Sequence, residues 1–166
     1  MVAVYLGLGS NIRPREHLQR ALQGLMRLYG PLRCSPVYES EAVGFDGDNF
    51  LNMVTIIECE RPLSAIAAEI RQLELDNGRE RQSERFSART LDIDLLLYGD
   101  EVVNEPGLAL PRDEIRHYAF VLKPLFDVAP TLRLPDNGDT VRELWQAFDA
   151  ASQPLRVVEF EIPPAA

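Results

Sequence analysis

The strongest strand signal in this chain is Thr90-Leu91-Asp92-Ile93-Asp94-Leu95-Leu96-Leu97-Tyr98, which is followed by the turn residues Gly99-Asp100. Side chains alternate between the two faces of a β-strand. An ideal strand therefore puts Leu91, Ile93, Leu95 and Leu97 on one face and places both Asp92 and Asp94 on the other. Aspartate is disfavoured in strands. The pattern predicts a half-buried strand that presents a pair of carboxylates on one side.

The segments before this strand alternate between strand and helix signals. Turn residues separate them, and prolines stand where helices are expected to begin. In chain order we predict a strand over 2–8 with turn residues at 7–11, a helix from Pro14, strands over 34–40 and 50–60 separated by a loop at 41–48, a helix from Pro62, and the strand over 90–98. This order predicts a ferredoxin-like βαββαβ sandwich of the α+β class, with a mainly antiparallel sheet.

Additional helices and one strand are expected after this unit. The sequence has no repeat or linker, so we predict one domain over residues 1–166. The expected elements are a hairpin partner of the 90–98 strand at Val102-Val103, a loop over 104–111, a helix over 113–122 that Pro124 ends, a helix with a capping box of Thr140 and Glu143, and a closing strand over 155–162.

Composition excludes several classes of protein. The 166 residues carry a net charge of −9, which argues against broad binding to nucleic acid or to anionic membranes. No apolar run reaches the roughly 18 residues of a membrane helix, and the N-terminus lacks the pattern of a secretory signal. Cys34 and Cys59 are expected to be reduced core thiols. These features predict a cytoplasmic protein.

The two aspartates are candidate metal ligands. Their Cβ atoms are expected about 6.5–7 Å apart, which lets the carboxylates converge on two metal ions, and hard oxygen ligands suit Mg²⁺. Five arginines gather nearby and could neutralise a polyphosphate: Arg71, Arg79, Arg81, Arg85 and Arg89. The alternatives are two solvated aspartates on an outer face and arginines that form surface ion pairs with Asp76, Glu80 and Glu84.

Other motifs of nucleotide and hydrolase chemistry are missing. There is no G-x-x-x-x-G-K-[ST] loop, and the segment after Gly7 does not complete G-x-G-x-x-G. His17 is expected to be a solvated helix residue, and no nucleophile elbow accompanies either histidine. Phe50 and Asn52 share a strand face, where one can stack on a flat heterocycle and the other can hydrogen-bond its edge. Core packing is the alternative for Phe50.

Together these residues resemble those of the 6-hydroxymethyl-7,8-dihydropterin pyrophosphokinase family of folate biosynthesis. The similarity runs from Val4 to Pro130, and its most specific element is Arg89-Thr90-Leu91-Asp92-Ile93-Asp94. The other matching segments are Gly7-Leu8-Gly9-Ser10-Asn11, Phe50-Leu51-Asn52, Glu74 with Gly78-Arg79-x-Arg81, and Phe120-Val121-Leu122-x-Pro124-Leu125. The resemblance implies transfer of pyrophosphate from ATP to the pterin hydroxymethyl group, with release of AMP and with two Mg²⁺ ions.

The resemblance also implies a role for individual residues. Asp92 and Asp94 would be the metal ligands, and Arg79, Arg89 and Asp94 the catalytic residues. The pterin would contact Ser40, Val43, Phe50, Asn52 and Phe120. The nucleotide would contact Arg71, Glu74, Arg81, Phe86, Arg89, Leu95 and Arg112. No nucleic acid or membrane partner is expected, and the family implies a monomer or weak dimer.

The chain departs from the family pattern near the expected nucleotide site. Gly107 and Tyr118 replace basic residues, Arg112 replaces a histidine, and Asp113 follows it. Pterin and metal binding are therefore expected to be kept more reliably than ordinary ATP affinity. The alternatives are a paralogue that binds pterin or nucleotide with weak or no transfer activity, and a two-metal phosphatase.

Overall fold

An antiparallel sheet forms the centre of the molecule. The computed structural model describes residues 1–42, 47–78 and 91–164. The strands lie in the order β5-β1-β4-β3-β8, and β2 also pairs with β4. Their bounds are β1 Val2–Ser10, β2 Arg33–Cys34, β3 Val37–Ser40, β4 Phe50–Cys59, β5 Asp92–Tyr98 and β8 Arg156–Val158.

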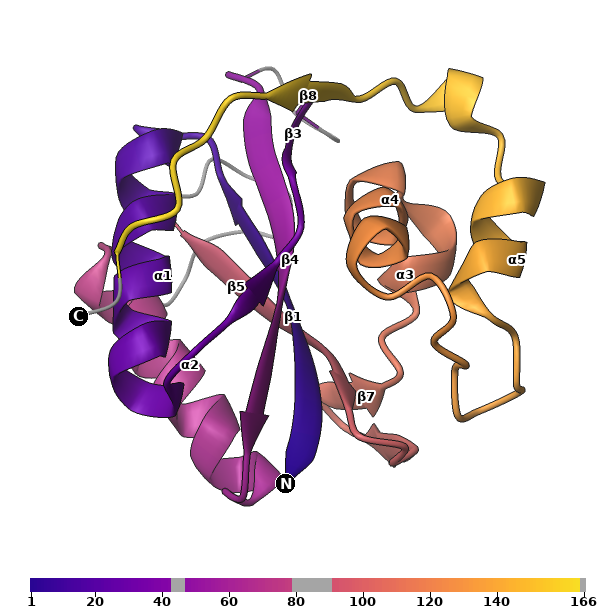
Figure 1. The fold of residues 1–166 in the computed structure, drawn as a ribbon, viewed down its shortest axis with the longest axis horizontal. Helices are drawn as coiled ribbons and strands as arrows, with labels where there is room; N and C mark the ends of the chain where they lie inside the picture. The colour runs from indigo at the N-terminus through magenta and orange to yellow at the C-terminus, as the bar shows by residue number, and fades with distance from the viewer. Residues whose placement is uncertain (43–46, 79–90, 165–166) are drawn as a thin grey trace.

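Helices cover both faces of this sheet (Figure 1). On one face lie α1 (Pro14–Tyr29) and α2 (Leu63–Asp76). On the other lie α3 (Glu114–His117), α4 (Ala119–Val128) and α5 (Val141–Ala147), and a short 3₁₀ turn, Ala150–Ser152, precedes β8. The first strand is central and pairs antiparallel with both β4 and β5. The predicted ferredoxin-like α+β sandwich is confirmed, with C-terminal elements forming a third layer.

Each layer of helices buries its own apolar core against the sheet. Leu18 and Leu22 of α1 pack with Ile66 and Ile70 of α2 in the first core. In the second core, Val121, Leu122 and Leu125 of α4 pack against Val54 and Ile56 of β4. Burial on both faces explains why β1, β4 and the last part of β5 are apolar runs, which a sheet with one solvated face would not show.

The strict alternation predicted for the 90–98 strand is wrong beyond Leu95. Tyr5 pairs with Leu97 but Leu6 pairs with Leu95, so one extra residue is inserted in β5. Such a bulge reverses the side on which the following side chains lie. Leu97 consequently packs in the second core and Tyr98 in the first. Asp92 and Asp94 precede the bulge, so they keep the predicted alternation.

The region after β5 also differs from the prediction. Residues 104–111 are not a loop, because β6 (Val103–Glu105) pairs with β7 (Leu108–Leu110) rather than with the strand over 90–98. Gly107 sits in the turn between them with φ +80°, a conformation that glycine adopts without steric cost. Glycine in place of the basic residue of the family pattern therefore suits the tight turn between β6 and β7.

Pro124 does not end the helix that precedes it. The break lies earlier, at Tyr118, whose extended backbone separates α3 from α4, and Pro124 lies inside α4. A proline within a helix costs about 3 kcal/mol. Leu122 and Leu125 are fully buried on either side of it, and their packing against the sheet offsets that cost.

Several local predictions can be compared directly with the structure. The capping box of Thr140 and Glu143 is present. Cys34 and Cys59 are both free thiols. His17 was expected to be solvated, but it is only 2% exposed. Its Nδ1 lies 2.6 Å from the carbonyl oxygen of Ile12, so the ring bonds to the backbone just before α1 instead of facing water.

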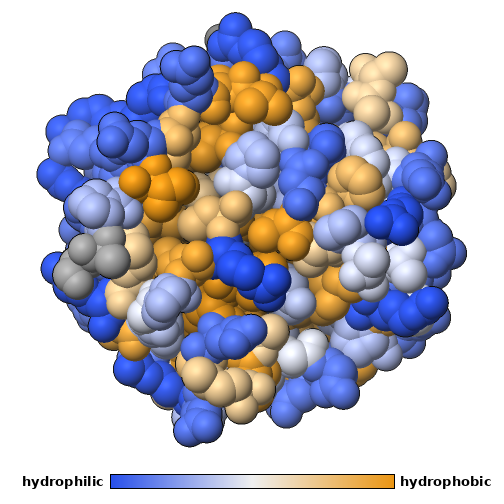
Figure 2. Space-filling view, in the orientation of Figure 1, coloured by the Kyte–Doolittle hydropathy of each residue, from blue (hydrophilic) through white to orange (hydrophobic). Residues whose placement is uncertain are grey.

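The surface mixes apolar and charged residues. Figure 2 shows hydrophobic areas across the middle of one face, with hydrophilic residues between and around them. Large apolar side chains that are exposed include Ile12, Val102 and Val157. Among the helices of the described residues, none combines the length and the apolar character needed to cross a bilayer.

Candidate active site

Three neighbouring strands place Asn52, Gly9 and Asp92 in one row. Gly9 of β1 pairs with Asn52 of β4 on one side and with Asp92 of β5 on the other. Directly paired residues of an antiparallel sheet lie on the same face. Two strand spacings separate the outer members of the row, so the Cα atoms of Asn52 and Asp92 are about 9–10 Å apart. Two residues earlier in β1, and on the same face, Gly7 pairs with Asp94.

The row lies on the face that α3 and α4 cover. A Cβ atom built on Gly7 would be 3.6 Å from the side chain of Leu96, which belongs to the core beneath α4. The prediction of turn residues at 7–11 is wrong for Gly7 and Gly9, since both lie within β1. Because both residues are glycines, β1 contributes no side chain between Asn52 and the two aspartates.

Gly9 belongs to the segment 7–11 that resembles the family, but the sequence pattern assigns it no role in the site. A Cβ atom at Gly9 would lie 3.1 Å from Oδ1 of Asn52 and 3.9 Å from Cδ1 of Phe50. The first contact is closer than ordinary van der Waals packing permits. Only pairing with β4 reveals this contact, because the two residues are far apart in the sequence.

We predict that Gly9→Ala weakens ligand binding beside Asn52 by about tenfold, because the added methyl group displaces the Asn52 amide. Gly7→Ala is the matched control on the same strand and face, since its Cβ would meet Leu96 at an ordinary 3.6 Å. Titration of both variants with the pterin, followed by fluorescence, measures the difference. Equal affinities in the two variants would contradict the prediction that ligand binding beside Asn52 needs a residue without a side chain at position 9.

The side chain of Asn52 is held by Ser40. Asn52 is 5% exposed, and its Nδ2 donates a hydrogen bond of 2.7 Å to Oγ of Ser40. This bond fixes the amide orientation and leaves Oδ1 on the Gly9 side. Phe50 lies two residues before Asn52 on the same strand and is partly buried. Phe120, at the start of α4, stacks on Tyr118 with ring centroids 5.1 Å apart.

Among the described residues of the site, Asp94 is the carboxyl group whose pKa departs furthest from its ordinary value. Burial, and next the nearby Asp92, raise the pKa of Asp94, while Arg112 lowers it. The Nη2 atom of Arg112 lies 3.5 Å from Oδ1 of Asp94 and 3.1 Å from Oε1 of Glu114. A carboxylate in this setting is costly to keep ionised without a further cation, since several negative groups surround one guanidinium.

The pair of aspartates fits a magnesium site. Within the described ranges, no group of three or more His, Cys, Asp or Glu side chains is arranged to hold a metal ion. Mg²⁺ commonly keeps water and substrate phosphates as ligands and takes only one or two carboxylates from the protein. Asp92 and Asp94 supply that number on one face, and the perturbed Asp94 would be stabilised as an anion by a divalent ion.

Two residues expected at the nucleotide lie on α2. Glu74 accepts a hydrogen bond of 2.9 Å from the backbone N–H of Ile93, between the two aspartates. Arg71 is exposed one turn earlier on the same helix. The side chain of Leu95 packs in the first core, on the face opposite to the aspartates, so only its main chain could meet a nucleotide there.

The other expected site residues fall into two groups. Val43, Arg79, Arg81, Phe86 and Arg89 lie outside the described residues. Asp113 lies next to Arg112 at the start of α3, and one of its carboxylate oxygens is 3.0 Å from Nε2 of His117. Glu114 was not singled out from the sequence, because a glutamate at the start of a short helix is an ordinary capping residue.

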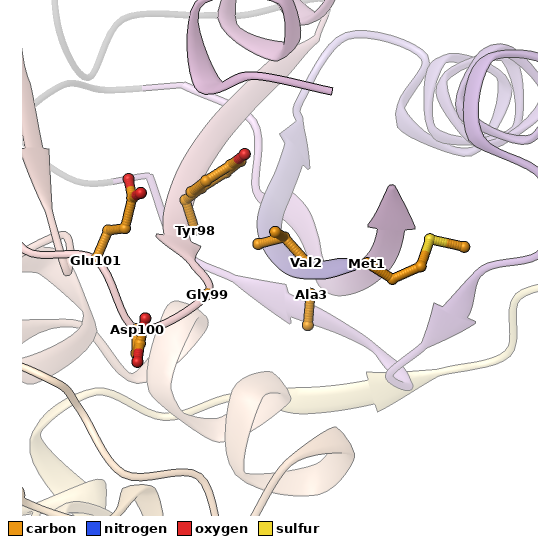
Figure 3. A pocket seen from close by; sticks show the side chains of 7 residues that line it. All are labelled: Met1, Val2, Ala3, Tyr98, Gly99, Asp100 and Glu101. Carbon is orange, nitrogen blue, oxygen red and sulfur yellow. The ribbon is translucent and has the colours of Figure 1, made fainter. Parts of the chain in front are cut away.

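A separate hollow of about 290 Å³ lies at the opposite end of β1 and β5. Met1, Val2 and Ala3 line one side of it, and residues 98–101 line the other (Figure 3). The hydroxyl of Tyr98 donates to the carbonyl of Arg61. Because Asp92 pairs with Gly9 at the other end of the sheet, this hollow is distinct from the candidate active site.

Comparison with known proteins agrees with the geometry. A model of the family described as 7,8-dihydro-6-hydroxymethylpterin-pyrophosphokinase matches residues 5–130. A protein of Pseudomonas aeruginosa named 2-amino-4-hydroxy-6-hydroxymethyldihydropteridine pyrophosphokinase is 41% identical over 139 residues, covering 81% of this chain and 85% of its own. The protein of the same name from Haemophilus influenzae is 35% identical over 152 residues, covering 89% and 94%.

A solved structure shares the fold. The Plasmodium falciparum HPPK-DHPS structure, described with STZ-DHP, superposes with a TM-score of 0.67 at 14% identity. The match covers 87% of this chain, and the chain spans 43% of that longer protein. The family model covers most of the chain, and the two bacterial relatives match over nearly their whole length. The chain therefore belongs to the 7,8-dihydro-6-hydroxymethylpterin-pyrophosphokinase family.

Proposed function

We propose that this protein transfers pyrophosphate from ATP to the hydroxymethyl group of 6-hydroxymethyl-7,8-dihydropterin and releases AMP, with two Mg²⁺ ions. The observation that carries the proposal is the row of Asn52, Gly9 and Asp92 across three strands. It puts a residue with an amide suited to a heterocycle edge two strand spacings, about 9–10 Å between Cα atoms, from a residue with a carboxylate suited to a metal–phosphate complex. The names of the bacterial relatives support the same reaction.

The pterin is assigned to the side of the row that Asn52 occupies. The Asn52 amide, held by Ser40, would hydrogen-bond the ring edge, with the chain near Val43 beside it. Phe50 and Phe120 would stack on the ring faces, since aromatic side chains bind flat heterocycles through dispersion and quadrupole interactions. Gly9 would let the ring lie against the sheet, because no side chain stands there.

ATP is assigned to the side of the row that the aspartates occupy. Asp92 and Asp94 would hold the magnesium ions, which when bound neutralise the phosphates and align them. Arg79 and Arg89 would bind the transferred phosphates and balance charge in the transition state. The remaining nucleotide contacts are assigned to Arg71, Glu74, Arg81, Phe86, Leu95 and Arg112.

The reaction needs positioning more than covalent help from the protein. The pterin hydroxymethyl oxygen bonds to the β-phosphorus and loses its proton, while the bond from that phosphorus to the bridging α-oxygen breaks. AMP leaves with the electron pair of that bond. Holding alcohol and phosphorus in line and neutralising the spread charge supplies most of the rate gain in phosphoryl transfer.

Product analysis tests this function. Purified protein is incubated with ATP, Mg²⁺ and hydroxymethyl-dihydropterin, and the nucleotide products are separated by chromatography. AMP that appears only with the pterin is the expected result. Formation of ADP or inorganic phosphate would contradict pyrophosphate transfer, and pterin binding without turnover would favour the binding paralogue over the enzyme.

We also propose a monomer or weak dimer that acts in a reducing compartment such as the cytoplasm. The free thiols of Cys34 and Cys59 support the compartment. Sedimentation over a range of concentrations tests the oligomeric state, and a stable higher oligomer would contradict it.

A further inference from the structure

Arg112 is held beside Asp94 by its backbone as well as by its charge. The chain leaves β7 along the outer edge of β5, and the N–H of Arg112 donates 2.9 Å to the carbonyl of Leu96. Its guanidinium contacts Asp94 and Glu114, and the side chain is 35% exposed. The Nε atom is buried and has no hydrogen-bond partner among the described residues. The side chain is therefore placed by Asp94 and Glu114, and its own hydrogen-bonding capacity is left incomplete.

The same carboxylate is assigned to a metal ion. Mg²⁺ binds a carboxylate oxygen at about 2.0–2.1 Å, whereas the guanidinium nitrogen lies 3.5 Å from Oδ1 of Asp94. A guanidinium and a divalent cation on one carboxylate repel each other strongly at such distances. The two cations therefore compete for Asp94.

We propose that Arg112 is the resident counter-ion of Asp94 in the metal-free protein, and that a divalent cation must displace it to bind. The inference rests on the proposed function through the assignment of Asp94 as a metal ligand. Arg112 acts here as a positioning residue that sets metal affinity. Glu114, 3.1 Å from the guanidinium, keeps the displaced side chain near the site.

Displacement has a consequence for the order of binding. A metal ion alone must break the contact between Arg112 and Asp94 without any compensation for the guanidinium. A metal–nucleotide complex brings phosphate oxygens that can accept the released guanidinium, since arginine binds phosphate well. Metal and nucleotide should therefore strengthen each other's binding, and this coupling is reciprocal.

Manganese binding to the nucleotide-free protein tests the proposal. Free Mn²⁺ is measured by electron paramagnetic resonance during titration of the wild-type chain, Arg112→Gln and Arg116→Gln. We expect Arg112→Gln to bind Mn²⁺ at least threefold more tightly than wild type. Arg116→Gln makes the same charge change four residues further along the chain, in α3. Arg116 pairs with Asp136 instead, so its Mn²⁺ affinity should stay within about twofold of wild type.

Thermal unfolding gives a second readout. Without metal, Arg112→Gln should lower Tm more than Arg116→Gln, and saturating Mn²⁺ should raise the Tm of Arg112→Gln more than that of wild type. Arg112→Met, which keeps much of the apolar stem, should behave like Arg112→Gln.

Unchanged or weaker Mn²⁺ binding in both Arg112 variants would overturn the proposal, as would an equal gain in Arg116→Gln. The proposed function can fail separately. If the wild-type protein makes no AMP but Arg112→Gln still binds Mn²⁺ more tightly than wild type, the transfer reaction is ruled out and this inference stands.

Discussion

Replacing Asp94 with Ala or Asn should reduce AMP formation by at least about a thousandfold, which corresponds to about 4 kcal/mol of transition-state stabilisation. Asp94 lies on the row side assigned to the phosphates, and its burial raises its pKa. Arg112 offsets part of the cost of ionising this carboxylate, and a bound divalent cation would offset more of it. Steady-state rates measured with saturating ATP and pterin give the comparison.

A matched control distinguishes a loss of catalysis from a loss of folded protein in the Asp94 variants. Asp100 follows β5 at the far end of the same strand and is exposed, so Asp100→Ala should retain the wild-type rate. The Tm of metal-free Asp94→Asn should be no lower than that of wild type. The amide keeps the shape of the carboxylate and removes its charge from a partly buried position beside Asp92 and Glu114. An active Asp94 variant would rule out this residue as a metal ligand.

Asn52→Ala should weaken pterin binding by about a hundredfold or more while leaving ATP affinity unchanged. Sites built to hydrogen-bond a polar ring edge lose most of their affinity when the matching group is removed. Asn52 is buried and fixed by Ser40, whereas the aspartates lie two strands away. Isothermal titration with each substrate separately measures both affinities.

The neighbouring Asn49→Ala supplies the control for Asn52. Asn49 is exposed and bonds only weakly to Glu39, at 3.4 Å, so its removal should leave pterin affinity within about twofold of wild type. Removing the Asn52 amide also leaves the buried Ser40 hydroxyl without this donor, which costs about 1–3 kcal/mol of stability. Loss of ATP affinity in Asn52→Ala would contradict the division of the row into a pterin side and a phosphate side.

Local patterns determined much of the architecture. The patterns over 2–8, from Pro14 and from Pro62 identified β1 and the starts of α1 and α2 to within a few residues. Alternation placed Asp92 and Asp94 on one face before the bulge. Such predictions succeed because side-chain periodicity depends on neighbours in the sequence. The specific Arg-Thr-Leu-Asp-Ile-Asp element identified the family, which the comparison with known proteins confirmed.

Other features depended on contacts between distant segments. The bulge in β5 follows from the register between Tyr5 and Leu97, and no alternation pattern contains it. Pro124 remains in a helix because the sheet covers Leu122 and Leu125. In both cases contacts between distant segments outweighed a preference of the local sequence.

By itself, the sequence determined which residue types this protein offers: a carboxylate pair, an arginine cluster just before it, and an amide with an aromatic neighbour. The tertiary structure alone decided that Asn52, Gly9 and Asp92 form one row and that Arg112 contacts Asp94. The physical reason is that pairing register and burial are set by contacts between residues far apart in the chain. Those contacts place the candidate pterin and phosphate groups about two strand spacings apart.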